Sequence, residues 1–181
     1  MANIHHFTVG LDTPRSAPCD TLVLSGVGVA SRTDTPEAIA LGRENGIQRV
    51  ILHVGSEDLA QLELQRFQGT VDTLVVPVQP DHGALTVAAR AIGLATDAGI
   101  GVAANTVLTA NALPALATVA RVLSRANPDS MTFTYPFPIT GNESSEAPAP
   151  TRVMAALRPA LDTLDKAGVH VNIKGLPACH L

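Results

Sequence analysis

The sequence predicts an α/β fold in which six parallel strands alternate with five helices as a partial (βα)6 TIM-like barrel. Short runs rich in β-branched residues alternate with longer segments in which apolar residues recur every three or four positions. Several of the predicted helices end at a glycine shortly before the next strand, as αβ loops often do. One face of the predicted strands is polar. Since strand and helix alternate, right-handed crossovers and a parallel sheet are expected.

The predicted strands are short apolar runs bounded by turn residues or charges. Residues 1–20 precede the first of them and are expected to form an N-terminal arm, which leaves residues 21–181 for a single barrel domain. The strands are TLVLSGV from Thr21, RVILHVG from Arg49, DTLVVPVQ from Asp72, GVAANTVL from Gly101, SMTFTYPF from Ser130 and VHVNIKG from Val169.

Helical spacing predicts a helix after each of the first five strands. Gly46, Gly99 and Gly168 end three of these helices, where a left-handed backbone costs glycine least. The stretch PITGNESSEAPAP after the fifth strand is rich in proline and serine and is interpreted as a loop. The five helical segments are residues 35–46, 57–69, 84–99, 112–127 and 151–168.

Strand spacing alone leaves open whether the sheet is doubly wound or part of a barrel. Side chains alternate between the two faces of a strand, and a sheet covered by helices on both faces is apolar on both. Here one face is polar, which predicts a barrel lumen that binds a small molecule; in the alternative, these groups meet solvent at the strand ends. The polar side chains on this face are Ser25, His53, Gln79, Asn105, Thr134, His170, Asn172 and Lys174.

Composition argues against several classes of partner. Charged residues make up 15 % of the chain and the net charge is -4, so no basic patch for nucleic acid is expected. No apolar run reaches the roughly 20 residues that span a bilayer, and the first residues lack a secretory signal, so a cytoplasmic protein is expected. Cys19 and Cys179 are interpreted as free thiols, with a disulfide as the alternative.

Two stretches, IALGRENGIQRVILHVGSEDL and GVAANTVLTANALPALATVARVLSRANPDSMTFTYPFP, resemble the core of radical S-adenosylmethionine (SAM) enzymes. The resemblance covers residues 20–181 and includes TVLTANAL after the fourth strand and IKGLPACHL at the sixth. The segment Gly55-Ser56-Glu57 looks like the family's Gly-Gly-Glu stretch, with serine in place of the middle glycine. The resemblance implies that this backbone and Glu57 meet the amino group of SAM.

The chain departs from the family at the loop SGVGVASRTDT, residues 25–35, where the resemblance implies three cysteines that hold an iron-sulfur cluster. This loop has none, so neither a cluster nor radical chemistry is expected, while SAM stays the candidate ligand. The Gly-Ser-Glu segment also has a local explanation, because Ser56 ahead of Glu57 and Asp58 is a good helix N-cap.

Three other hypotheses follow from the same residues. His53, Glu57 and Lys174 could support acid-base or Schiff-base catalysis in the lumen. A metal site is not expected, because no His-x-x-x-His or Cys-x-x-Cys spacing occurs and His53, His170 and Cys179 would have to converge. Six strands do not close a barrel, and the sequence stops at PACHL after the sixth. We therefore expect a two-fold homodimer, or a partner protein that covers the open side and could supply a cluster.

Overall fold

The protein is described by a computed structural model, which covers residues 4–8, 20–136 and 147–176. Its strands form one sheet in which sequence order equals spatial order and every neighbouring pair is parallel. The predicted parallel α/β fold is therefore confirmed. The strands are β1 Ile4–Thr8, β2 Thr21–Ser25, β3 Arg49–His53, β4 Thr73–Pro77, β5 Gly101–Val107, β6 Ser130–Thr134 and β7 His170–Lys174.

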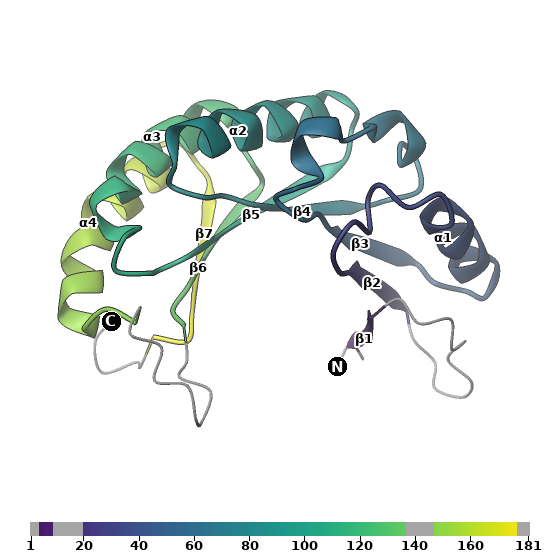
Figure 1. Ribbon diagram of the computed structural model, residues 1–181, viewed down its shortest axis with the longest axis horizontal. Coiled ribbons are helices and arrows are strands. Elements are labelled where there is room, and N and C mark those ends of the chain that lie inside the picture. The colour runs from purple at the N-terminus through teal and green to yellow at the C-terminus, as the bar shows by residue number, and fades with distance from the viewer. Residues whose placement is uncertain (1–3, 9–19, 137–146, 177–181) are drawn as a thin grey trace.

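All helices lie on the same, convex side of the curved sheet (Figure 1). Each crossover joins neighbouring strands with the same hand, so every connecting helix reaches the same face. The opposite, concave face is called the inner face below. The α-helices are α1 Thr35–Glu44, α2 His82–Asp97, α3 Leu116–Ala126 and α4 Pro150–Lys166, and the short 3-10 helices are η1 Leu59–Gln61, η2 Leu64–Arg66 and η3 Leu113–Ala115.

The predicted helix at residues 57–69 is wrong. The segment forms η1 and η2, separated by Leu62 in an extended conformation with ψ 112°. In one continuous helix Leu59 and Leu64 would lie about 140° apart, at 100° per residue. Breaking the helix lets Leu59, Leu64 and Phe67 all be buried under the sheet. Core packing therefore outweighs the local helical preference.

Strand β1 is an addition to the six predicted strands, all of which are present. It pairs with β2 in a register that runs from Ile4 opposite Thr21 to Thr8 opposite Ser25. Residues 4–8 therefore belong to the sheet, although we expected them in an arm. The sequence IHHFT lacks a β-branched run, and the open edge of β2 supplies the hydrogen-bonding groups that order it.

The hydrophobic core lies between the sheet and its helices. Buried and partly exposed residues alternate along β4, β5 and β6, and the buried set faces the helices. Leu52, Leu74 and Val102 form one fully buried row across three strands in register. The core is mainly aliphatic, with Phe67 and Phe133 as its largest fully buried side chains.

Side-chain carboxylates tie the amino ends of the strands together. Asp72 Oδ2 accepts bonds from the Val50 N–H at 2.6 Å and from Arg43 Nη2 at 2.7 Å. Asp129 Oδ2 accepts a bond of 2.7 Å from the Val102 N–H. These two carboxylates are therefore engaged in holding the sheet. In the described part of the chain, no helix combines the length and apolar character needed to cross a membrane.

Candidate functional site

The inner face carries polar side chains that the sequence predicts there. Asn105, Thr132 and Asn172 form a row across β5, β6 and β7, and Val107, Thr134 and Lys174 form the next row toward the carboxyl ends. Neighbouring positions in such a row are about 4.8 Å apart. We call the polar members of these two rows the inner-face patch: Asn105, Thr132, Thr134, Asn172 and Lys174.

One hydrogen bond fixes the centre of the inner-face patch. Thr134 Oγ1 donates to Asn105 Oδ1 at 2.9 Å, from β6 to β5. This bond identifies which end of the Asn105 amide is the oxygen. The NH₂ group at the other end can therefore donate hydrogen bonds to another molecule. Asn172 and Lys174 are exposed beside it, whereas Asn105 and Thr134 are half-buried. The patch therefore offers several donors and one cation toward the open side of the sheet.

Glu57 reaches the inner face from the turn after β3. Gly55 continues the alternation of that strand, because Val54 is buried on the helix side and its N–H bonds to Val75 O. The Glu57 carboxylate occupies the space that a Cβ on residue 55 would take, with Oε2 2.7 Å from that position. Only glycine allows this approach. The carboxylate thus lies at the carboxyl end of β3, on the inner face.

Ser56 of the Gly55-Ser56-Glu57 segment is not a helix N-cap, so that local explanation is wrong. The first helical element after β3 is η1, its N-cap is Asp58, and no side chain caps it. Ser56 Oγ instead lies 3.4 Å from Glu57 Oε2. Since Ser56 caps no helix, local helix chemistry does not account for Glu57.

A bond that sequence reasoning missed ties the loop after β2 to the turn after β3. Ser31 Oγ donates to Asp58 Oδ1 at 2.5 Å, while Asp58 Oδ2 is buried without a hydrogen-bond partner among the described residues. Thr35 Oγ1 also donates to Val29 O at 2.6 Å within the loop. The two partners of the first bond are 27 positions apart, so no local pattern marks the pair. A hydroxyl and a carboxylate thus hold the loop of residues 25–35 against the turn after β3.

The tip of the same loop is apolar. Val27 is 90 % exposed between Gly26 and Gly28, which have φ of 137° and 68°. Val107, 46 % exposed, ends β5 on the inner face. These two exposed valines place apolar surface at the carboxyl ends of the strands, beside the polar side chains of the inner-face patch.

Several predicted site residues lie away from the inner-face patch. Ser25 and His53 are half-buried at the ends of β2 and β3, and Gln79 is exposed after β4. His170 is four residues before Lys174 on β7, or about 13 Å along the strand. The sheet therefore brings together Asn105, Thr134, Asn172 and Lys174, but not His170.

The structure does not support a metal site within the part of the chain it describes. His53 and His170 are separated by four strand spacings, from β3 to β7. No group of three or more histidine, cysteine, aspartate or glutamate side chains could hold a metal ion among residues 4–8, 20–136 and 147–176. Cys179, the third member of that hypothesis, lies outside the described residues, as does Cys19.

No family model and no curated protein matches this chain. Solved structures do match its fold. A domain of a pyruvate-formate lyase-activating enzyme from Bacteroides vulgatus has a TM-score of 0.64 at 11 % identity, covering 85 % of this chain and 98 % of that one. SuiB from Streptococcus suis, bound to S-adenosylmethionine, has a TM-score of 0.67 at 10 % identity, covering 86 % of this chain.

The chain has the partial-barrel fold of the radical SAM core. It spans 39 % of the length of SuiB, so it corresponds to one part of that protein. Another structure of SuiB, bound to the precursor peptide SuiA, matches over 86 % of this chain at 10 % identity with a TM-score of 0.67. At identities of 10–11 % the similarity concerns the fold.

The residues of this chain do not fit the iron-sulfur cluster of the radical SAM core. A site-differentiated four-iron cluster needs three thiolates from the protein. The 181 residues contain two cysteines, Cys19 and Cys179, and neither belongs to the loop of residues 25–35. Ser31 and Asp58 bond to each other in that region instead.

Proposed function

We propose that the inner face binds a small molecule, with SAM as the first candidate, and that these residues perform no radical chemistry of their own. The observation that carries the proposal is the Glu57 carboxylate, which lies over Gly55 at the inner face. A carboxylate there is suited to an ammonium group. The inner-face patch offers amide, hydroxyl and ammonium donors on the same face.

The chemistry of SAM suits these groups. SAM carries an ammonium, a carboxylate, a sulfonium, a ribose and an adenine. In our proposal Glu57 holds the ammonium at the amino-acid end of the ligand. Lys174, four strands away on β7, faces the ribose and adenine end. The Asn105 amide and Asn172 bond to hydroxyl or ring atoms, and Val27 and Val107 contact apolar surface. Small-molecule sites commonly combine apolar walls with a few placed polar groups in this way.

We assign the other predicted residues to the rim of the same site. Ser25 begins the loop of residues 25–35, His53 precedes the Gly55 turn, and Gln79 follows β4 at the carboxyl end of the sheet. His170 is the weakest member because of its distance from the inner-face patch. The proposal includes the expected cytoplasmic location, where two free thiols are stable.

Titration calorimetry with SAM, S-adenosylhomocysteine and adenosine tests the proposal. Binding of SAM and of S-adenosylhomocysteine, both weakened by Glu57→Gln, is the expected result. Asp97→Asn, an exposed charge change at the end of α2, is the matched control and should leave binding unchanged. If none of the three compounds produces a heat of binding at millimolar concentration, the SAM assignment is refuted.

Lumen catalysis is the second hypothesis, and the geometry favours it less. Lys174 is exposed, whereas lysines that form Schiff bases are usually desolvated or placed beside another cation. No other lysine or arginine lies in the inner-face patch with it. We therefore assign Lys174 to ligand binding.

We also propose that a second chain completes the open sheet. Among the described residues, β1 and β7 each pair with a single strand, which leaves two edges open. A two-fold homodimer through β1 is the simplest arrangement, with a partner protein as the alternative. Sedimentation equilibrium at micromolar concentration distinguishes a dimer from an 18.7 kDa monomer.

A further inference from the structure

The outer edge of β7 has backbone groups available for pairing. The His170 N–H donates to Asp129 O at 3.4 Å, and Lys174 O accepts from the Tyr135 N–H at 2.8 Å. In a parallel ladder, alternate residues bond to the same neighbour. Residues 170, 172 and 174 therefore face β6, and the N–H and C=O groups of Val171 and Ile173 point to the other side. No strand of the described residues pairs with that side.

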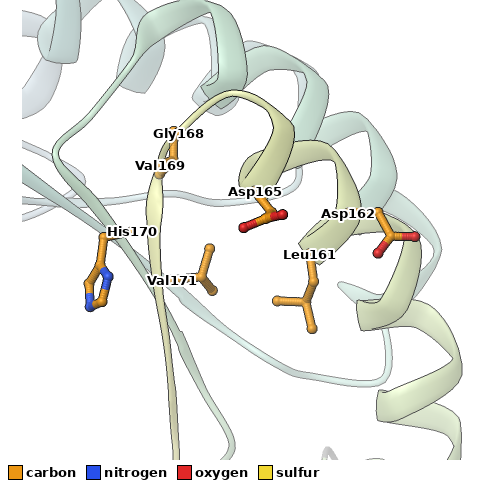
Figure 2. Close-up of a pocket in the computed structure, with 7 residues that line it drawn as sticks. All are labelled: Leu161, Asp162, Asp165, Gly168, Val169, His170 and Val171. Atoms are coloured by element: carbon orange, nitrogen blue, oxygen red, sulfur yellow. The ribbon is translucent and has the colours of Figure 1, made fainter.

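A groove of about 570 Å³ runs between this edge and the last turns of α4 (Figure 2). Val171 points toward Leu161 of α4, and the two side chains give the groove an apolar floor. The His170 side chain points away from α4. Gly168, at φ 75°, ends the helix, and the Val169 N–H bonds to Leu164 O at 3.1 Å. This turn fixes how far the strand lies from the helix.

The rim of the groove is acidic. Asp162 and Asp165 line it from one face of α4, three positions apart, and both are exposed. In Figure 2 the Asp165 carboxylate lies on the side of α4 that faces β7. Within the described residues the ion pairs are Arg32–Asp34 and Arg43–Asp72, so neither rim carboxylate has a cationic partner there.

We propose that this groove accepts an extended, basic strand of another polypeptide. The strand pairs with the outward N–H and C=O groups of Val171 and Ile173, as in β-strand addition to an open edge. An apolar side chain of the strand packs over Leu161 and Val171. A lysine or arginine of the strand faces Asp162 and Asp165, which gives the site its charge preference.

A second copy of this chain is a poor occupant of the same edge. In an antiparallel β7–β7 pair, the Asp162 and Asp165 of both copies would face one shared groove, and like charges would repel. A homodimer through β1 leaves β7 free for the basic strand. The groove lies beside the first half of β7, away from Lys174 and the inner-face patch. The proposal therefore does not depend on SAM binding.

Fluorescence anisotropy tests the proposal with a labelled eight-residue peptide in which valine and lysine take turns at every second position and threonine fills the positions between. Valine and lysine then lie on the same face of the added strand, toward α4. The expected result is binding that is lost when glutamate replaces lysine, and also when two central threonines are replaced by proline. Asp162→Asn with Asp165→Asn should weaken binding about fivefold, the effect of losing two exposed ion pairs. Asp97→Asn is the charge control and should have no effect. Equal binding of the proline peptide, or an equal loss with Asp97→Asn, would show non-specific charge attraction and overturn the proposal.

Backbone pairing is tested separately at Val171. Val171→Pro removes an outward N–H and leaves the bonds to β6 in place, as proline on an edge strand can. It should abolish peptide binding, while Val171→Thr should keep it. If Val171→Pro fails to fold by circular dichroism, hydrogen exchange on the wild-type protein provides the same test. The peptide should then slow exchange at Val171 and Ile173, and unchanged exchange at saturating peptide would contradict strand addition.

Discussion

Thr134 Oγ1 donates a hydrogen bond of 2.9 Å to Asn105 Oδ1, which joins β6 to β5 on the inner face. The two residues are 29 positions apart in the sequence and come together through the register of the parallel sheet. Because the hydroxyl engages the amide oxygen, the amide nitrogen of Asn105 is held ready to donate. The pair is therefore a test of whether the inner-face patch is preorganised for a ligand.

Thr134→Val should weaken SAM binding about fivefold. The substitution keeps the shape and removes the donor, and one hydrogen bond contributes about 1 kcal/mol. Thr86→Val is the matched control, since the Thr86 hydroxyl bonds to His82 O on the exposed surface of α2, outside the inner-face patch. Calorimetry on both variants measures the difference, and equal affinities would assign the bond to the sheet alone.

Gly55→Ala should weaken SAM binding as strongly as Glu57→Gln does. The added Cβ takes the space of the Glu57 carboxylate, which has to move away while its charge is retained. Gly93→Ala in α2 is the control, because a Cβ there meets nothing within 4 Å. It should leave binding unchanged and stabilise the protein by about 0.5–1 kcal/mol. Full SAM affinity in Gly55→Ala would show that Glu57 is not a contact.

Ser31→Ala should destabilise the protein by about 1–3 kcal/mol in urea unfolding. The substitution removes the Ser31 hydroxyl, which is the only hydrogen-bond donor to the buried Asp58 carboxylate among the described residues. Ser124→Ala on α3, where the hydroxyl bonds to Arg121 O on the surface, should change the free energy by less than about 0.5 kcal/mol. Similar small changes in both variants would mean that the loop is held by other contacts.

Asp34 should titrate below its ordinary pKa of 3.8. The hydrogen bond from Arg32 lowers this pKa most, and its positive charge acts in the same direction. Since the folded pKa is depressed, the contribution to stability is present above pH 3.8 and is lost as the pH falls through the lower folded value. NMR titration of Asp34 measures this, and Arg32→Gln should raise the midpoint toward 3.8.

Anaerobic reconstitution with iron and sulfide should leave this chain colourless. The 181 residues have two cysteines, and a four-iron cluster needs three protein thiolates. Iron analysis and the absorbance at about 400 nm measure whether a cluster has formed. About four irons per chain would contradict the prediction and point to ligands other than cysteine.

The sequence alone determined the features that depend on local periodicity. Alternation along β7 separates Val171 and Ile173 from Asn172 and Lys174, and this period of two needs no knowledge of neighbouring strands. The same argument applies to the buried and half-buried residues of β4, β5 and β6. Helix-ending Gly46, Gly99 and Gly168 have positive φ, as their positions predicted.

Tertiary structure decided the features that join distant segments. Residues 57–69 have helical spacing, yet they break at Leu62 because three apolar side chains are buried better in two short turns. Strand β1 forms because an edge of β2 is open, and that edge exists only once the sheet has assembled. Ser31 with Asp58, and Thr134 with Asn105, meet across 27 and 29 positions. Strand register and packing bring such pairs together, and a periodicity read along one segment carries no information about either.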